Sequence, residues 1–232
     1  MKNVSTLLIS LVCFVANSFG QSTKEFNLSN FDRIDLGSAF KIEIRPGNFK
    51  VVAEGRQEDL DELEGKVGNN GALIVRYKDS KGWSWNKNRK TVHLVILMPQ
   101  LKGLDLSGAT TTTVEGFKNV DNMELDISGA SRLNAAFNAK KVDLDISGAS
   151  TIVLEGKADM MKGEISGATT FRAGSFVVEE VKMSISGASS AKLNVTKSLK
   201  ADASGASSIK YAGGAKNVST DTSGASSIRK ED

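Results

Sequence analysis

Acidic side chains recur at a fixed distance from a repeated tripeptide in the C-terminal half of the chain. Ser-Gly-Ala occurs seven times, and in all but one copy an Asp or Glu stands three residues before its glycine. The residues at this position are Asp105, Asp126, Asp145, Glu164, Ser184, Asp202 and Asp221. In stacked copies, neighbouring carboxylates would lie about 5–7 Å apart and repel one another by about 1 kcal/mol per pair.

Two of the copies carry a second carboxylate two residues upstream, so that Glu124, Asp126, Asp143 and Asp145 would form one patch. Carboxylate oxygens are the ligands that Ca²⁺ prefers, and the patch therefore predicts a calcium site. The alternative interpretation is a solvated face whose carboxylates splay apart or pair with lysines such as Lys140. The sequence leaves both interpretations open.

Both tryptophans of the chain, Trp83 and Trp85, lie in one cationic segment that runs from Lys81 to Lys90. In an extended strand the two rings would point to the same side. Exposed aromatic faces flanked by cations suit acidic glycans or a partner protein, so the pair predicts a binding surface. The alternative is that the rings cover an edge of the N-terminal sheet and carry a stacked Lys or Arg.

The chain offers little that could perform catalysis. His93 is the only histidine, and it alternates with apolar neighbours as a strand residue does. Cys13, the only cysteine, lies in the apolar N-terminal stretch, which excludes thiol catalysis and disulfides from the mature chain. We therefore expect no enzymatic activity and no cofactor beyond the candidate Ca²⁺. Paired carboxylates on a β-helix keep a carbohydrate-active enzyme as the alternative.

The repeated tripeptide also indicates the elements that hold these side chains. Its glycines recur every 18 to 21 residues, a period typical of stacked repeats. Segments before it, such as Met123 to Ile127, alternate apolar and polar residues, and a second short strand follows it. Two strands and two corners per period predict an all-β fold. Residues 101–232 would form a parallel β-helix, a two-sheet solenoid with coils of about 19 residues. A Ser or Thr two residues after each repeat glycine predicts hydroxyl ladders along the coils.

The N-terminal half divides into two parts. Residues 1–20 read as a secretory signal peptide, with one lysine, an apolar stretch and small residues before Gln21. Residues 22–100 predict an N-terminal β cap region with one short helix between Gln57 and Lys66. An uncovered end coil would expose unpaired backbone, so a cap is physically required. The strands predicted there are Phe31 to Leu36, Phe40 to Arg45, Phe49 to Ala53, Leu73 to Tyr77 and Val92 to Met98.

Charge and hydropathy restrict the partners. The chain has 30 basic and 27 acidic side chains, a balance that does not predict a nucleic-acid partner. Beyond the signal peptide no apolar stretch is long enough to predict a transmembrane segment in the mature chain. We expect an exported protein in the periplasm, on the outer-membrane surface or outside the cell, with self-association as an option.

Taken together, these features resemble a family of Bacteroidetes described as "putative auto-transporter adhesin", with a head GIN domain. The resemblance rests on the N-terminal β region, on the strand Val95 to Pro99 that runs into Leu101 to Ala109, and on the repeated corners. It covers Phe31 to Ile228. It implies a two-sheet superhelix related to pectin-lyase-like folds, no catalytic residues, and a role in cell adhesion.

The function expected from the sequence is thus a non-enzymatic, exported adhesion or binding module that presents a rigid solenoid face to glycans or cell-surface proteins. A carbohydrate-active enzyme, either a polysaccharide lyase or a hydrolase, is one alternative. A purely structural envelope protein is the other.

Overall fold

The computed structural model describes residues 22–78 and 88–231, and nearly all of its regular structure is β. Strands hold 67% of the described residues and helix 2%, which confirms the predicted all-β class. The predicted signal peptide, residues 1–20, lies outside the described residues. The elements in chain order are β1 (Ser22–Phe26), β2 (Arg33–Leu36), β3 (Lys41–Pro46), β4 (Lys50–Gly55), α1 (Gln57–Asp61), β5 (Leu63–Val67), β6 (Ala72–Tyr77), β7 (His93–Met98), β8 (Gly103–Leu106), β9 (Thr111–Ile127), β10 (Arg132–Ile146), β11 (Thr151–Ile165), β12 (Thr170–Ile185), β13 (Ser190–Ala203), β14 (Ser208–Ala212), β15 (Asn217–Thr222) and β16 (Ser227–Lys230).

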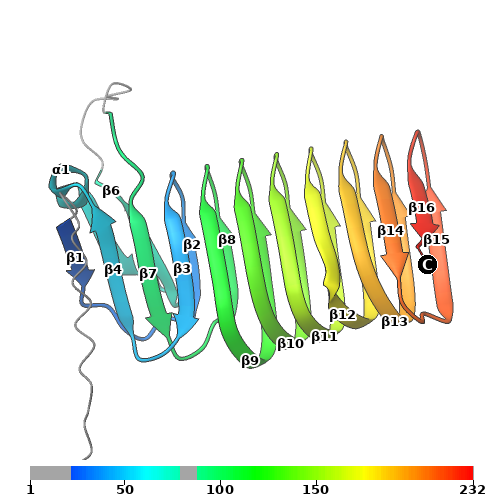
Figure 1. The fold of residues 1–232 in the computed structure, drawn as a ribbon, viewed down its shortest axis with the longest axis horizontal. Helices are drawn as coiled ribbons and strands as arrows, with labels where there is room; N and C mark the ends of the chain where they lie inside the picture. Colours follow the sequence, from blue (N-terminus) through cyan, green and yellow to red (C-terminus); the bar gives the residue numbers. More distant parts are fainter. Residues whose placement is uncertain (1–21, 79–87, 232) are drawn as a thin grey trace, which may run out of the picture.

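The repeats form the predicted solenoid, with about seven turns and coils of about 19 residues. Figure 1 shows the coils side by side along the long axis, with sharp corners at one end and rounded bends at the other. We call the strands that run into the Ser-Gly-Ala corners the leading sheet, and the strands that follow the corners the trailing sheet. Each of β9 to β13 starts in the trailing sheet, bends, and ends in the leading sheet. Neighbouring coils of the repeats pair in parallel.

Glycine is required at the corners because the corners stack on one another. Gly148 has a φ of +82°, a left-handed conformation that side chains with a Cβ rarely adopt. A Cβ at this position would lie 2.3 Å from the carbonyl oxygen of Gly129, the corner of the preceding coil. The amide of Ala149 donates a hydrogen bond to that same oxygen at 2.8 Å. The tripeptide therefore sets the close approach of successive coils as well as the turn.

The hydroxyl row that follows the corners points into the protein. Its first six members are at most 3% exposed: Thr110, Ser131, Ser150, Thr169, Ser189 and Ser207. Thr110 Oγ1 donates to Ser131 Oγ at 3.0 Å. Ser189 Oγ instead donates to the carbonyl of Gly167 at 3.2 Å, and most members follow this second pattern. The predicted ladder is present, and its bonds run mainly from a hydroxyl to the backbone of the preceding coil.

The hydrophobic core is the layer between the two sheets. Ile127, Ile146, Ile165 and Ile185 pair from coil to coil and are at most 2% exposed. Burial of such a side chain stabilises the fold by about 1.5–3 kcal/mol. Buried side chains fill this layer along the stack, so a ligand would meet the outward faces of the sheets.

The N-terminal region continues the same coil, but its strands are not in sequence order. β2 and β3 pair in parallel with β8 and β9, and Ser38, with a φ of +82°, takes the place of the corner glycine between them. β6 and β7 then pair in parallel with the outer side of β2 and β3. β7 therefore lies between β3 and β4, although only a short turn separates those two strands in the chain (Figure 1).

Antiparallel strands end the stack. β4 pairs with β7, β5 with β6, and β1 with β4. The helix α1 joins β4 to β5 at the corner end of the coils and buries Leu60 completely. The helix predicted between Gln57 and Lys66 is confined to its first five residues, because Leu63–Val67 pairs with β6 as a strand. Within the described ranges, no helix has the length and apolar character needed to cross a membrane.

Candidate functional site

The row of carboxylates predicted from the repeats lies in one register along the leading sheet and is interrupted only by Ser184. The structure adds Asp35 of β2, which pairs directly with Asp105 of β8. We call the complete row the acidic column. Its members, each in register with the next, are Asp35, Asp105, Asp126, Asp145, Glu164, Ser184, Asp202 and Asp221.

Electrostatic repulsion and burial act together at the N-terminal end of the acidic column. Burial, and then the charges of Asp35 and Asp126, raise the pKa of Asp105. Burial and the charge of Asp145 raise the pKa of Asp126. A groove of about 230 Å³ follows the other end of the column, past Glu164 and Asp202. The acidic column therefore favours the binding of protons and cations to its carboxylates.

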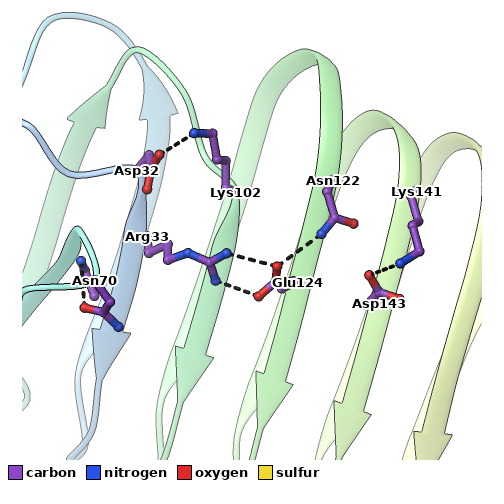
Figure 2. A network of polar contacts seen from close by, with 9 residues as sticks. Asp32, Arg33, Asn70, Lys102, Asn122, Glu124, Lys141 and Asp143 are labelled. Carbon is purple, nitrogen blue, oxygen red and sulfur yellow. Dashed lines mark hydrogen bonds and ion pairs between the residues drawn. The ribbon is translucent and has the colours of Figure 1, made fainter.

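Two of the four residues in the predicted calcium patch are bound by cations of the chain itself. Arg33 donates two hydrogen bonds to the Glu124 carboxylate, from Nη1 to Oε2 at 2.6 Å and from Nη2 to Oε1 at 2.9 Å (Figure 2). This pairing lowers the pKa of Glu124, and Asn122 donates a further hydrogen bond to it at 3.1 Å. Lys141 Nζ donates to Asp143 at 2.7 Å.

Arg33 reaches Glu124 because the strand between them carries no side chain at this level. The register places Gly103 of β8 directly between the two residues. A Cβ on Gly103 would lie 2.8 Å from Arg33 Nη1. The guanidinium therefore crosses one strand and links β2 to β9. The sequence analysis did not find this contact, since it depends on pairing between residues 91 positions apart.

The other two patch residues, Asp126 and Asp145, form no ion pair with any described residue. They line a shallow groove of about 420 Å³ together with Glu164 and Lys162. No group of three or more Asp, Glu, His or Cys within residues 22–78 and 88–231 is arranged to hold a metal ion. The calcium site at Glu124, Asp126, Asp143 and Asp145 stays a prediction, and it would require two of these carboxylates to exchange a cationic partner for the ion.

The predicted aromatic surface, Trp83 and Trp85, lies outside the described residues. Beside that segment Arg89 stacks on the ring of Tyr77, with Cζ 4.0 Å from the ring centroid. Arg89 also pairs with Glu62, Nη2 to Oε2 at 3.0 Å. A cation does stack on an aromatic ring in this region, and the ring is that of Tyr77.

His93 of β7 lies between glutamates of the two neighbouring strands. Its Nε2 is 3.1 Å from Glu43 Oε1 on β3, and its Nδ1 is 3.4 Å from Glu54 Oε2 on β4. The register places His93 directly opposite Glu54 on β4, and on β3 opposite Lys41, two residues before Glu43. These are the surroundings expected of a structural strand residue.

A second charged row, which the sequence analysis missed, lies on the trailing sheet. Arg172, Lys192, Lys210 and Arg229 pair directly with one another on β12, β13, β14 and β16, and all four are exposed. We call them the cationic column. Each stands five residues after a repeat glycine, so an alignment of the repeats would have found them. A groove of about 710 Å³ beside the column extends from Val153 to Lys210.

Solved structures share this architecture. A "putative adhesin" from Bacteroides fragilis is 22% identical, with a TM-score of 0.85 over 92% of this chain and 98% of that one. A "putative adhesin" from Parabacteroides merdae is 17% identical, with a TM-score of 0.71 over 92% and 97%. A "putative lipid binding protein" from Parabacteroides distasonis is 20% identical, with a TM-score of 0.71 over 92% and 97%. At these identities the likeness shows the fold.

A search of curated proteins finds no match. The family described as "Putative auto-transporter adhesin, head GIN domain" matches residues 30–215, in agreement with the resemblance noted in the sequence. Because that match covers most of the coiled structure, from β2 to the end of β14, the chain belongs to the auto-transporter adhesin family with a head GIN domain.

Proposed function

We propose that the protein is an exported, non-enzymatic adhesion module whose flat sheet faces bind surface molecules such as glycans or cell-surface proteins. The observation that carries the proposal is the direct register of outward side chains, which lines up like charges over successive coils on both sheets. Rows of this kind suit many weak contacts along an extended partner rather than one deep pocket. The family and two of the related structures carry the description adhesin, which supports the same reading.

The arrangement of the carboxylates favours binding over sugar cleavage. Glycoside hydrolysis needs two carboxyl groups that face each other across the scissile bond. In the acidic column the carboxylates instead stand side by side on neighbouring strands and point the same way, as Asp126 and Asp145 do. Such a row can hold cations or a cationic partner, and it does not place an acid opposite a nucleophile.

The location of the protein provides the first test, because adhesion requires an exposed protein. Intact host cells would be treated with a protease, and the chain would be followed by immunoblot beside a periplasmic marker. We expect the chain to be degraded while the marker survives. Survival of both would contradict adhesion and would favour the structural envelope protein.

Binding provides the second test. Labelled protein would be applied to a glycan array and to immobilised cell-surface glycoproteins, with a variant that combines Trp83→Ala and Trp85→Ala. We expect retention of the wild type and weaker retention of the variant. Equal retention of both would remove the tryptophan pair from the proposal, and no retention of either would remove the adhesion function.

A further inference from the structure

We propose that the cationic column binds a linear anionic glycan laid along the solenoid axis. The inference rests on the proposed function, and it names the surface and the ligand class. The four cations come from consecutive coils of the trailing sheet, in direct register. At the usual strand spacing of about 4.8 Å, the column spans about 14 Å. An extended polymer with anionic groups at intervals of one or two coils would therefore meet several of these cations at once.

The structure already contains one anion on this surface. The carboxylate of Glu231 bridges the middle two cations, Oε2 to Lys192 Nζ at 2.6 Å and Oε1 to Lys210 Nζ at 3.0 Å. These two lysines lower the pKa of Glu231. Their own side chains remain more than half exposed, 53% and 56%. Glu231 thus shows how a single carboxylate fits between cations of consecutive coils, and an external anion would have to displace it.

The outer members of the column are available to a ligand. Arg172 and Arg229 form no ion pair with a described residue, and both are exposed. The carboxylate nearest to Arg172 along the preceding strand is Glu155, which the register places opposite Ser175 rather than opposite Arg172. A polymer bound along all four positions would therefore contact two guanidinium groups that have no ion-pair partner among the described residues, as well as the two lysines.

A row of hydroxyls beside the cationic column favours a glycan over other polyanions. Two residues before each cation stands a Ser or Thr on the same face, and the row continues onto β11. Its members are Thr151, Thr170, Ser190, Ser208 and Ser227. Sugar rings carry hydroxyl groups that can exchange hydrogen bonds with this row. Single-stranded nucleic acid instead calls for exposed aromatic platforms, and Phe171 beside the column is buried.

The leading sheet offers a matched control. Lys162, Lys182 and Lys200 also line up on three consecutive coils, so they match three members of the cationic column, Arg172, Lys192 and Lys210, in charge and spacing. They differ in their neighbours, because the acidic column runs two residues away on the same face. Those carboxylates reduce the potential over the lysines, and we expect this row to contribute little to polyanion binding.

The experiment compares two triple variants of the purified full chain, Arg172→Gln/Lys192→Gln/Lys210→Gln and Lys162→Gln/Lys182→Gln/Lys200→Gln. The probes are heparin and polygalacturonate, with neutral dextran as the uncharged control, in binding titrations at 150 mM salt. We expect the first variant to lose about tenfold in affinity and the second to stay within about twofold of wild type. Glu231→Gln should bind about two- to threefold more tightly, because the internal anion is removed. Thermal unfolding of each variant checks that the fold is intact.

Other outcomes would overturn the inference. Equal losses in the two triple variants would mean that net charge, and not the cationic column, governs binding. Tighter binding to a thymidine oligonucleotide, or to vesicles with phosphatidylglycerol, than to either glycan would assign the surface to another class of ligand. Binding to neutral glycans or cell-surface glycoproteins without binding to the anionic probes would refute this inference and leave the proposed adhesion function standing.

Discussion

The repeats and the N-terminal region build the same coil by different means. Every sharp corner of the repeats is Ser-Gly-Ala, and each corner glycine after Gly108 lies directly against the one before it. In the N-terminal region one corner is Gly37–Ala39 and another is formed by α1. The coil itself therefore does not require the tripeptide. What requires it is a run of tight corners that lie directly on one another.

The strongest test of this comparison is to place a methyl group between two stacked corners. Gly148→Ala combines a φ of +82° with a Cβ 2.3 Å from the Gly129 carbonyl oxygen, so we expect a loss of about 3 kcal/mol or more in the free energy of unfolding. Gly214→Ala is the control, because its Cβ would meet nothing closer than the Thr196 oxygen at 3.9 Å. Urea unfolding measures both. Equal midpoints would contradict the stacking argument.

The next test concerns the end of the stack. Leu60 of α1 is completely buried, and Leu60→Ala should cost about 2–5 kcal/mol. Because each coil contacts its neighbours only, the loss should be local, with faster amide hydrogen exchange in β1 and β4, which α1 contacts, and unchanged exchange in β12 and β13. A uniform change along the stack would show that the cap and the repeats unfold as one unit.

The third test addresses the ion pair that joins the two regions. Arg33→Met should cost about 1 kcal/mol, and a double-mutant cycle with Glu124→Gln should give a coupling of about 0.5–1 kcal/mol, since both side chains are partly exposed. Arg33 lowers the pKa of Glu124. The stabilisation is therefore present above the unfolded-state pKa, about 4.3, and is lost as the pH falls through the lower folded-state value. A coupling that is unchanged between pH 7 and pH 3 would contradict this assignment.

The acidic column should show the opposite dependence on pH. Burial and Asp145 raise the pKa of Asp126, so the folded protein binds its proton more tightly and becomes less stable as the pH rises through the folded-state pKa. Asp126→Asn should raise the melting temperature at pH 7 by about 1 °C. At pH 3 the melting temperatures of the variant and the wild type should be the same. A lower melting temperature for the variant at pH 7 would show that the carboxylate stabilises the fold.

The last test concerns calcium. If the patch binds Ca²⁺, millimolar calcium should raise the melting temperature of the wild type by about 1–2 °C relative to a chelator. The variant Asp126→Asn/Asp145→Asn should show no such shift. Identical responses of the two proteins would end the calcium hypothesis.

The parts of the fold that depend on local pattern could be predicted from the sequence. The period of the glycines and the alternation before them give the coil, and the coil places Asp105 beside Asp126. Asp35 was missed because its corner has Ser38 where the repeats have glycine. The position of β7 between β3 and β4 was also missed, since no local signal tells a strand to pair with one that lies far away in the chain.

The candidate sites also divide into those that a local sequence pattern reveals and those that depend on long-range pairing. The acidic column was visible because all its members share one offset from the glycine. The cationic column shares another offset, but only four of the seven repeats carry a cation there, so its pattern is weaker. The ion pair between Arg33 and Glu124 could not be predicted. It depends on the absence of a side chain at Gly103 and on a strand register that only the folded N-terminal region provides.

The stacked corners have a consequence for how such a protein changes in evolution. Because each corner makes the same contacts with the one before it, duplication or deletion of one whole period leaves every remaining junction as it was. The N-terminal end, by contrast, is made of unique pieces and has no internal copy to replace it. The length of the molecule, and with it the number of charged positions that it displays, can therefore be adjusted in steps of one period without redesign of its ends.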